Sequence, residues 1–414
     1  MSYILCVDCI RDTNLKRLFT ELGFKSVCDM CGRASSHTLS VENKRFQTFL
    51  KAVIRYHYSE TKYNSHWGGY MHWVSLFSRE NPIFCFVYNG KNDNDKFSFA
   101  LESIDGHIDD FDSDVSLYFG GGRMDAFISS IKNDTCEVIM ELESAILKIN
   151  PYIVATRLAT HLKKLKNLKI IDKTLTDKKY FRARIGVEYI LADEFSTFTD
   201  NYDEIAIPYK NRSIAAPCPV IASEGRLNRQ KTSYIYLASN IDTAIAEVKP
   251  NKKHYISIGE FEITKELDRL RIADFHTLDF YDFTESDNAI DEYVILKSIQ
   301  ERLSLPNPDK NYDFTQVIAD ALILLGFDGV KFSSSVNDGF NLVLFDTNQV
   351  SYVRNSHKAV VINEVKYQYH YLDTTLDTDK RIEYYIKGNN NIHLDDLIEE
   401  HFGIKEYSRL IISR

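Results

Sequence analysis

Residues 225–249 contain side chains whose types and spacing suit chemistry on a substrate. An arginine, an asparagine, a tyrosine and a glutamate lie in this short stretch, at Arg226, Asn228, Tyr236 and Glu247. Their spacing predicts a turn, a strand, a second turn and a helix. Arginine makes charge-assisted, bidentate hydrogen bonds to phosphate, and a fixed carboxylate stabilises positive charge that develops on a sugar. An arginine and a carboxylate on short rigid elements therefore suit a pocket for a phosphorylated sugar.

A second reactive group lies near the N-terminus, where Cys6, Cys9, Cys28 and Cys31 form two Cys-x-x-Cys pairs. Two residues between cysteines let both thiolates turn onto one ion, and Gly32 suits the reversed backbone of such a turn. Four thiolates in tetrahedral geometry select zinc and form a closed, structural site. The alternatives are two disulfides, unrelated buried thiols, or a redox pair without its usual βαβ surroundings. We interpret the pattern as a zinc ribbon.

The sequence patterns around these groups predict a chain with several domains. The zinc ribbon spans residues 1–38, and the recurrence of apolar residues with a helical period makes 39–172 a mostly helical domain. Between 173 and 355, short β-rich runs alternate with helical ones, which is typical of an α+β domain. Residues 356–414 form a C-terminal extension with strand and helix patterns and no assigned role.

Apolar periodicity also predicts individual elements. In the helical domain, helices are expected over 41–62, over 124–149, and again after Pro151. In the α+β domain, strands are expected at 181–185, 234–238, 255–262, 329–332 and 342–345. Helices are expected there at 242–248, 291–303 and 315–325.

The bulk composition is typical of a globular protein with more than one core. The chain has 414 residues, of which 44% are hydrophobic and 26% charged. Its net charge of −9 argues against broad nucleic-acid binding. No apolar window of about 18 residues predicts a membrane span, and the first residues lack a signal-peptide pattern. Because seven cysteines in this spacing do not form a secreted disulfide framework, we expect a cytoplasmic protein.

We expect several basic side chains to have structural roles and no catalytic one. His57 continues the apolar stripe of the first helix and is interpreted as a half-buried packing residue. Arg157 and His161 lie one helical turn apart, but no other residue supports a ribonuclease pair, so surface or packing roles are expected. A solvated helix face is the interpretation of the closely spaced lysines Lys163, Lys164, Lys166 and Lys169.

Four sequence blocks in order resemble the RES-domain family, which is named for an arginine, a glutamate and a serine. The blocks read YFRAR at 180–184, GRLN at 225–228, YLA at 236–238 with TAIAEV at 243–248, and GFDGVKFSSS at 326–335 with NLVLFD at 341–346. The cysteine pairs and the helical region that precede these blocks also resemble the HEPN/RES subgroup.

The resemblance implies a fold similar to ADP-ribosyltransferases and an enzyme that consumes NAD+, usually as a toxin. Most members of the family cleave the nicotinamide–ribose bond by hydrolysis or phosphorolysis. By position, the family arginine is Arg182, the glutamate is Glu247 and the serine is Ser334, with Ser333 and Ser335 as neighbouring alternatives.

One position departs from the family pattern. Lys249 stands where the family commonly has arginine, and lysine lacks the planar fork of a guanidinium. Tyr236 matches a strand position at which the family often has tyrosine.

The chemistry of NAD+ suggests roles for these residues. Nicotinamide leaves from a cationic form, so the barrier lies in an oxocarbenium-like ribose, which Glu247 could stabilise. Ser334 and Asn341 could bond the amide or the ribose, and the Tyr236 ring could stack on nicotinamide. We expect the catalytic residues to be Arg182, Glu247, Ser334 and Tyr236. We expect NAD+ to be bound by Arg184, Arg226, Asn228, Ser335 and Asn341.

Each of these residues also has a structural alternative. The strand arginines could form surface ion pairs, Arg226 and Asn228 could be plain turn residues, and Glu247 could be an exposed helix residue. The serines could form a polar loop, and Tyr236 could be a core aromatic.

Three functions follow from the sequence. The first is an NAD+-degrading toxin or defence effector that uses water or inorganic phosphate. The second is an ADP-ribosyltransferase that modifies a macromolecule, and the third is a non-catalytic, zinc-containing binding protein. The expected partners are NAD+, phosphate, an antitoxin or activating protein, and a second copy of the chain, but no membrane.

Overall fold

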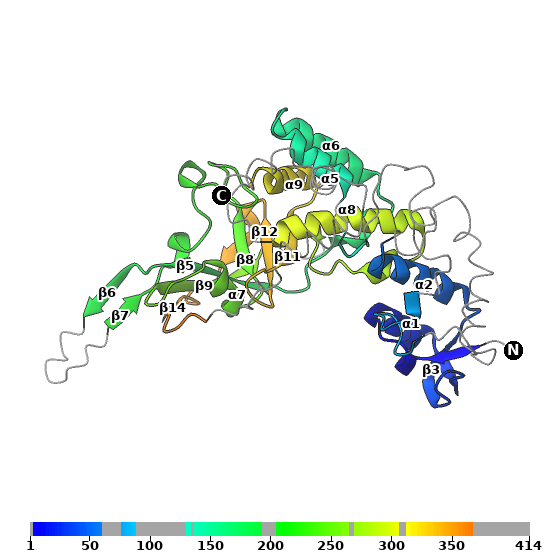
Figure 1. Ribbon diagram of the computed structural model, residues 1–414. Coiled ribbons are helices and arrows are strands. Elements are labelled where there is room, and N and C mark those ends of the chain that lie inside the picture. The colour runs from blue at the N-terminus through cyan, green and yellow to red at the C-terminus, as the bar shows by residue number, and fades with distance from the viewer. Residues whose placement is uncertain are drawn as a thin grey trace, which may run out of the picture. The chain divides into compact units, whose positions relative to one another are not determined.

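The computed structural model describes residues 3–59, 76–87, 130–133, 136–192, 204–264, 269–305 and 312–366. The chain divides into two compact units, 1–363 and 364–414. All helices and strands of the described residues belong to the first unit (Figure 1). In the described ranges, no helix is long and apolar enough to cross a lipid bilayer.

The N-terminal residues form a small antiparallel sheet that brings the two cysteine pairs together. Strands β1 (Ile4–Cys6), β2 (Phe24–Val27) and β3 (Ala34–Ser40) lie in the order β1-β3-β2. Between β1 and β2 lie the 3-10 turn η1 (Val7–Cys9) and helix α1 (Thr13–Leu22). The predicted ribbon boundary at residue 38 falls inside β3.

The predicted helices that follow are present in the described residues. Helix α2 (Lys44–His57) begins after Asn43, whose side chain accepts a hydrogen bond from the backbone of Phe46. Its predicted apolar stripe is buried. The helix expected over 124–149 is wrong in its extent: of its described residues only α5 (Glu137–Ala145) is α-helical, and residues 131–133 form a turn. The rest of that range falls outside the described residues. Helix α6 (Pro151–Lys163) begins with proline in its first turn, as expected.

Helix α6 and the residues after it present their basic side chains to solvent. Arg157 and His161 are exposed, which agrees with the predicted surface role. The lysine run is exposed as well, at Lys163, Lys164, Lys166 and Lys169.

The α+β part is built on a nine-stranded sheet whose long path reads β13-β9-β5-β8-β12-β11-β10-β4, with β14 also paired to β9. The pairs are antiparallel except for β10 with β11. The strands that carry predicted site residues are β5 (Lys179–Ile185), β8 (Ile235–Ala238), β11 (Gly329–Ser333) and β12 (Phe340–Leu344). The others are β4 (Asp172–Lys173), β9 (Tyr255–Ile263), β10 (Ile272–Asp274), β13 (Val350–Tyr352) and β14 (Lys358–Val361).

Three helices of the α+β part match the predicted ones: α7 (Ile241–Glu247), α8 (Asp287–Ser304) and α9 (Asp313–Leu324). A separate hairpin consists of β6 (Tyr189–Ala192) and β7 (Glu204–Ile207). Short 3-10 turns are η4 (Leu168–Ile170), η5 (Asn211–Ser213), η6 (Pro219–Ile221), η8 (Phe280–Phe283) and η9 (Thr347–Gln349). Figure 1 shows one end of α8 at β11, with α6 against α9.

The strand register separates the two faces of the sheet. Phe181 pairs with Ala238, which pairs with Asn341, which pairs with Phe332, so these four side chains share one face. Part of this face packs under α7, where Ala183, Ala238 and Ile258 join Ala244 of that helix. The opposite face buries Tyr180, Leu237, Leu342 and Phe261.

A single buried cluster joins the N-terminal region to the α+β part. It includes Leu5 of β1, Phe49 of α2, Phe280 of η8, Ile299 of α8 and Val343 of β12. The domain boundaries predicted near residues 38 and 172 therefore both fall within one packed unit. The C-terminal extension predicted at 356–414 lies mostly outside the described residues, which include only its strand β14 and residues up to 366.

His57 is held by a charge partner as well as by packing. Its Nε2 lies 2.8 Å from Oδ2 of Asp12, and both side chains are largely buried. The other oxygen of Asp12 accepts a hydrogen bond from the backbone of Leu15 at 2.7 Å and caps α1. The expectation of a plain packing residue was incomplete, because the partner lies 45 positions away in the sequence.

Replacing Asp12 separates the two roles of this carboxylate. Asp12→Asn keeps an oxygen for the Leu15 amide but removes the charge that faces His57, whereas Asp12→Ala removes both. Because loss of an N-cap costs about 1 kcal/mol, we expect the alanine variant to be less stable than the asparagine variant by about that amount. Urea unfolding followed by circular dichroism measures the difference, and equal stabilities would contradict the capping role.

Candidate active site

Glu247, Ser334 and Asn341 converge at the end of α7. Oε1 of Glu247 accepts a hydrogen bond from the Ser334 hydroxyl at 2.6 Å and another from the Asn341 side-chain amide at 2.6 Å. All three residues are half-buried. A carboxylate with two donors on one oxygen is held in a fixed plane. In the part of the chain that the structure describes, Oε2 makes no hydrogen bond.

Local sequence explains why these three groups meet. Asn240 caps α7 by accepting a hydrogen bond from the Thr243 backbone, which fixes the start of the helix. The loop between β11 and β12 packs against this cap through Gly339, where a Cβ would lie only 2.2 Å from Oγ1 of Thr243. Because no larger residue fits there, the loop can close on α7 and bring Ser334 to Glu247.

The structure separates the three adjacent serines. Ser334 contacts Glu247, whereas Oγ of Ser333 lies 2.9 Å from Nδ1 of His276 on the other side of the loop. Ser335 is exposed. The family serine predicted at Ser334 is therefore the one that joins the cluster.

Arg182 lies apart from this cluster. Its position on β5 places it on the face opposite to Phe181 and Asn341, and its Nη1 donates to the Tyr236 carbonyl at 3.1 Å. Its Nε is buried without a hydrogen-bond partner among the described residues. Burial lowers the pKa of Arg182 to about 10, and the nearby charge of Arg184 adds to this effect. An unsatisfied buried donor of this kind is costly unless a ligand supplies an acceptor.

The Tyr236 hydroxyl is committed to the neighbouring turn. It donates to Oδ1 of Asn228 at 2.8 Å and accepts from the backbone of Leu227 at 3.0 Å. Burial raises the pKa of Tyr236, so the hydroxyl remains protonated at neutral pH. The Tyr236 ring packs against the main hydrophobic cluster.

Asn228 organises the turn from within. Its side-chain amide donates to the carbonyls of Ser223, Arg229 and Thr232. Gly225 fits closely beside it, since a Cβ there would lie 2.5 Å from the Asn228 oxygen. Asn228 is thus a buried structural residue in this structure, which was the alternative to its predicted role in binding NAD+.

The remaining predicted arginines bond to protein carbonyls. Arg226 donates to the carbonyl of Leu303 in α8, and Arg184 donates to that of Ser213 at 2.6 Å. The Arg184 guanidinium also stacks 4.4 Å from the centre of the Tyr209 ring. Neither arginine hydrogen-bonds to the glutamate cluster in this structure.

Two residues that sequence reasoning missed support the site. Gln316 of α9 is buried and bonds to Glu224 and to the carbonyls of Gly225 and Asn228, which ties the turn to the helix. His276 bonds Ser333, and burial together with the charge of Lys331 lowers its pKa. Each is an isolated polar residue in the sequence, and no spacing pattern marks either one.

Comparison with known proteins identifies the domain that carries this cluster. Residues 201–369 match the family model of the RES domain. The chain carries a RES domain. The matched range contains Glu247, Ser334 and Asn341 and begins after Arg182.

Two further comparisons accompany the family match. A chain in the crystal structure of the M. tuberculosis MbcT-MbcA toxin–antitoxin complex is similar, with 12% identity and a TM-score of 0.28. That match covers 50% of this chain and 92% of the other. The comparison with curated proteins gives no match.

The four N-terminal cysteines form a cluster outside the RES domain. Their sulfur atoms all lie within 4.8 Å of one another, and the shortest pairs are 3.6–3.8 Å apart. A tetrahedral metal with bonds of about 2.3 Å to sulfur gives sulfur–sulfur distances of about 3.8 Å. Burial raises the pKa of Cys6 to about 11 and also raises that of Cys9. The donor set therefore fits one metal ion that displaces the thiol protons.

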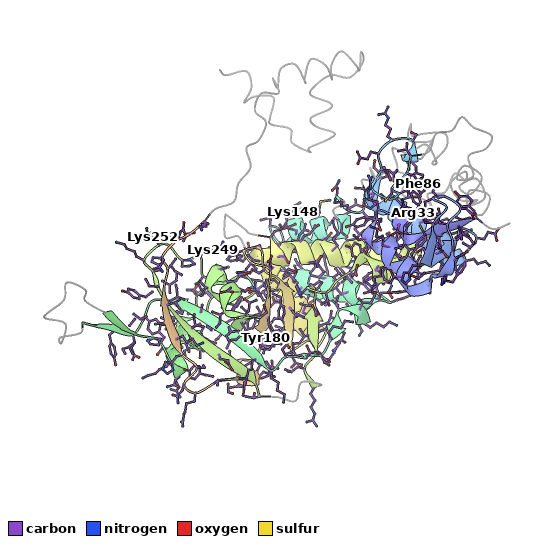
Figure 2. The ribbon with its side chains drawn as sticks, turned by 90° about the horizontal axis from the view of Figure 1, so that it is seen from below. Arg33, Phe86, Lys148, Tyr180, Lys249 and Lys252 are labelled. Atoms are coloured by element: carbon purple, nitrogen blue, oxygen red, sulfur yellow. The ribbon has the colours of Figure 1, made fainter. Side chains whose placement is uncertain are left out.

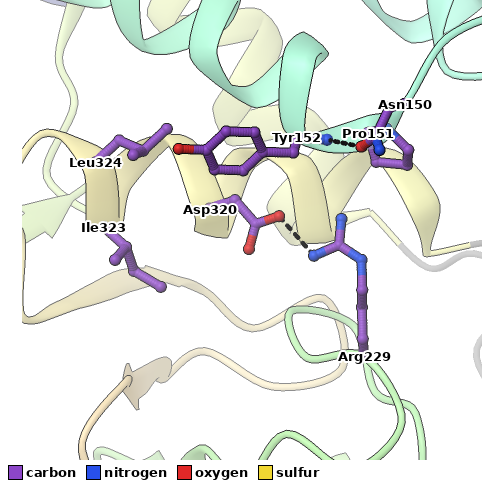
Figure 3. Close-up of a pocket in the computed structure, with 7 residues that line it drawn as sticks. All are labelled: Asn150, Pro151, Tyr152, Arg229, Asp320, Ile323 and Leu324. Carbon is purple, nitrogen blue, oxygen red and sulfur yellow. Dashed lines mark hydrogen bonds and ion pairs between the residues drawn. The ribbon is translucent and has the colours of Figure 1, made fainter.

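A surface groove of about 430 Å³ lies away from the glutamate cluster, between the start of α6 and the end of α9 (Figure 3). The Arg229–Asp320 ion pair crosses it, with Nη1 and Oδ2 at 2.5 Å. Its other walls are Asn150, Pro151, Tyr152, Ile323 and Leu324. None of the predicted site residues lines this groove.

The contrast between two asparagines is testable. Asn228→Ala removes the amide bonds to the carbonyls of Ser223, Arg229 and Thr232 and the acceptor of the Tyr236 hydroxyl, so we expect it to lower the unfolding free energy by about 2 kcal/mol. Asn341→Ala removes one bond to Glu247, and we expect a decrease of about 1 kcal/mol or less. Chemical denaturation measures both variants. The structural interpretation of Asn228 fails if its variant is as stable as that of Asn341.

Proposed function

We propose that the RES domain cleaves the nicotinamide–ribose bond of NAD+ and transfers the ADP-ribose unit to water or inorganic phosphate. The observation that carries this proposal is the cluster at Glu247, in which a fixed carboxylate has a hydroxyl and an amide on one oxygen and a second oxygen free for substrate. The family match supports it, since the matched range contains all three residues.

The reaction needs stabilisation of positive charge more than acid catalysis. The bond between ribose C1′ and the nicotinamide nitrogen breaks, and its electron pair leaves with nicotinamide, which becomes neutral. Positive charge then builds on the ribose, where the Glu247 carboxylate can stabilise it. Water or phosphate supplies the new oxygen at C1′, and with water a proton is lost from the attacking molecule.

The neighbouring groups have supporting roles in this proposal. Ser334 and Asn341 hold the carboxylate, and in this proposal they also bond the ribose hydroxyls or the nicotinamide amide. The ring of Tyr236 offers a surface on which nicotinamide can stack. Arg182 lies on the sheet face opposite to Asn341, so this proposal assigns it no contact with the substrate held at Glu247.

Positive charge also lies at the end of α7. Lys249 and Lys252 are exposed on the loop after Glu247 (Figure 2). Lys249 has a left-handed backbone, with φ of 47°, directly before Pro250. We include this loop in the proposal as a source of attraction for an anionic substrate.

We propose that the protein is a cytoplasmic toxin that depletes NAD+ when it is not inhibited. A fold similar to ADP-ribosyltransferases, and silencing by an antitoxin or release by an activating partner, belong to this proposal and follow from the family resemblance. Transfer of ADP-ribose to a macromolecule is the second candidate, because the same donor site serves a side-chain nucleophile.

The test is product analysis of NAD+ incubated with the full chain, with and without phosphate. We expect nicotinamide release by the wild type and a fall of about 10²-fold or more in Glu247→Gln, which keeps the shape but removes the charge. Asp242→Asn, on the exposed side of the same helix, is the matched control and should keep its activity.

The products separate the candidate functions. Dependence on phosphate indicates phosphorolysis, and label retained on a macromolecule indicates ADP-ribosyl transfer. Nicotinamide release that survives in Glu247→Gln would refute the role of the carboxylate. If no condition gives release from the wild type, the binding function becomes the better explanation.

We further propose that Cys6, Cys9, Cys28 and Cys31 hold a structural Zn²⁺, which stabilises the small N-terminal sheet. Purified protein should contain one zinc ion per chain by elemental analysis. Cys28→Ser should lose most of the metal and lower the thermal midpoint, because Cys28 is a buried ligand. Cys218→Ser, at an exposed cysteine outside the cluster, is the control and should retain zinc.

A further inference from the structure

The N-terminal module, defined here as residues 3–59, contacts a short segment of the RES domain, residues 275–284. This segment follows β10 and ends just before α8. We propose that the module positions the catalytic Ser334 through this segment, and that His276 is the positioning residue. The expected effect on the rate of NAD+ cleavage rests on the proposed function. The contact between the module and the loop that carries Ser334 is tested separately.

Polar contacts clamp the far end of the segment to α1. Nη1 of Arg17 lies 2.8 Å from Oδ2 of Asp279, and the Arg17 guanidinium lies 4.0 Å from the centre of the Tyr281 ring. The Tyr281 hydroxyl donates to Glu21, one turn further along α1. Both charges and ring stacking therefore fix this end of the segment.

Helix α2 adds a second set of contacts. Arg45 donates to the carbonyl of Thr284 at 2.7 Å and to its hydroxyl oxygen at 2.8 Å. Tyr56 stacks on Phe280 with ring centres 4.6 Å apart. Two helices of the module, α1 and α2, thus contact a segment that lies within the range matched by the RES-domain model.

The near end of the segment holds the loop that carries Ser334. Nδ1 of His276 lies 2.9 Å from the Ser333 hydroxyl, and the imidazole lies 5.0 Å from the centre of the Phe340 ring. Ser333 ends β11 and Phe340 begins β12, so one imidazole contacts both ends of the loop. The segment is also tied to β11 by the Phe275 amide, which donates to the Lys331 carbonyl.

The position of Ser333 determines that of Ser334. Successive side chains of an extended backbone point in opposite directions, so a Ser333 that is held by His276 leaves Ser334 directed at Glu247. Lys331 and Asp274 are the charged groups near His276, and burial together with the charge of Lys331 lowers its pKa, which favours the neutral imidazole beside Ser333. A shift of His276 would therefore move the loop and lengthen the Ser334–Glu247 bond.

Two substitutions at His276 separate hydrogen bonding from packing. His276→Phe keeps a ring against Phe340 but cannot bond Ser333, whereas His276→Asn places a polar atom near the position of Nδ1. For NAD+ cleavage we expect His276→Phe to lower kcat by about 10²-fold with a smaller change in KM, because the substitution displaces Ser334 from the Glu247 carboxylate and leaves the other proposed binding residues in place. His276→Asn should restore most of the rate. Equal rates for wild type and His276→Phe would overturn the proposal.

The connection to the module has a test that does not depend on activity. Hydrogen exchange of the peptide that covers residues 334–340 should become faster in Arg17→Ala/Arg45→Ala, since the segment is then no longer clamped to α1 and α2. Arg11→Ala is the matched control: it lies in the same module but bonds Glu80 and the Asn81 carbonyl instead, and it should leave this peptide unchanged.

The two experiments fail independently. If the wild type does not cleave NAD+ but the exchange of 334–340 responds to the double variant and not to the control, the proposed function is wrong and the coupling stands. If exchange is unchanged in the double variant, or changes equally in the control, the coupling is refuted whatever the activity.

Discussion

The structure of the site depends on one half-buried carboxylate that takes both of its donors from a distant hairpin. Glu247 ends a helix of only seven residues, which has little stability of its own and must be held by its cap and its packing. Asn240 supplies the cap, and the sheet face below supplies the packing. The β11–β12 hairpin then supplies Ser334 and Asn341, so that the helix and the hairpin fix each other's positions.

A second set of hydrogen bonds, in the turn before β8, holds the scaffold and not the Glu247 cluster. Asn228, Gln316 and the Tyr236 hydroxyl use their polar atoms on one another and on the turn between them. Such closed networks rigidify a site because every member is satisfied. Arg182 differs, since its buried Nε has no partner in the described part of the chain. The polar groups of the turn thus hold the scaffold, whereas Arg182, on the sheet face opposite to Asn341, keeps an unpartnered donor among the described residues.

Sequence alone predicted the elements better than the contacts between them. The strong apolar periods of β5, β8, β9, β11 and β12 and of α7 to α9 gave the right elements within a few residues, and the spacing of Cys6, Cys9, Cys28 and Cys31 predicted the cluster that the structure contains. Short strands such as β4 and β10 carry too few residues for a period to be visible. Asn228 and His57 show the other limit: their roles are set by partners that only tertiary packing brings near, and residue type does not distinguish a turn-holding asparagine from one that binds a ligand.

The residues of the Glu247 cluster are far apart in the sequence, so they are synthesised at different times. Ser334 and Asn341 lie 87 and 94 positions after Glu247, and the crossover through α8 and α9 comes between them. A nascent chain on the ribosome exposes α7 well before the hairpin that completes the site, and a product truncated before β11 lacks both donors. The cluster at Glu247 can therefore form only after β11 and β12 have been synthesised.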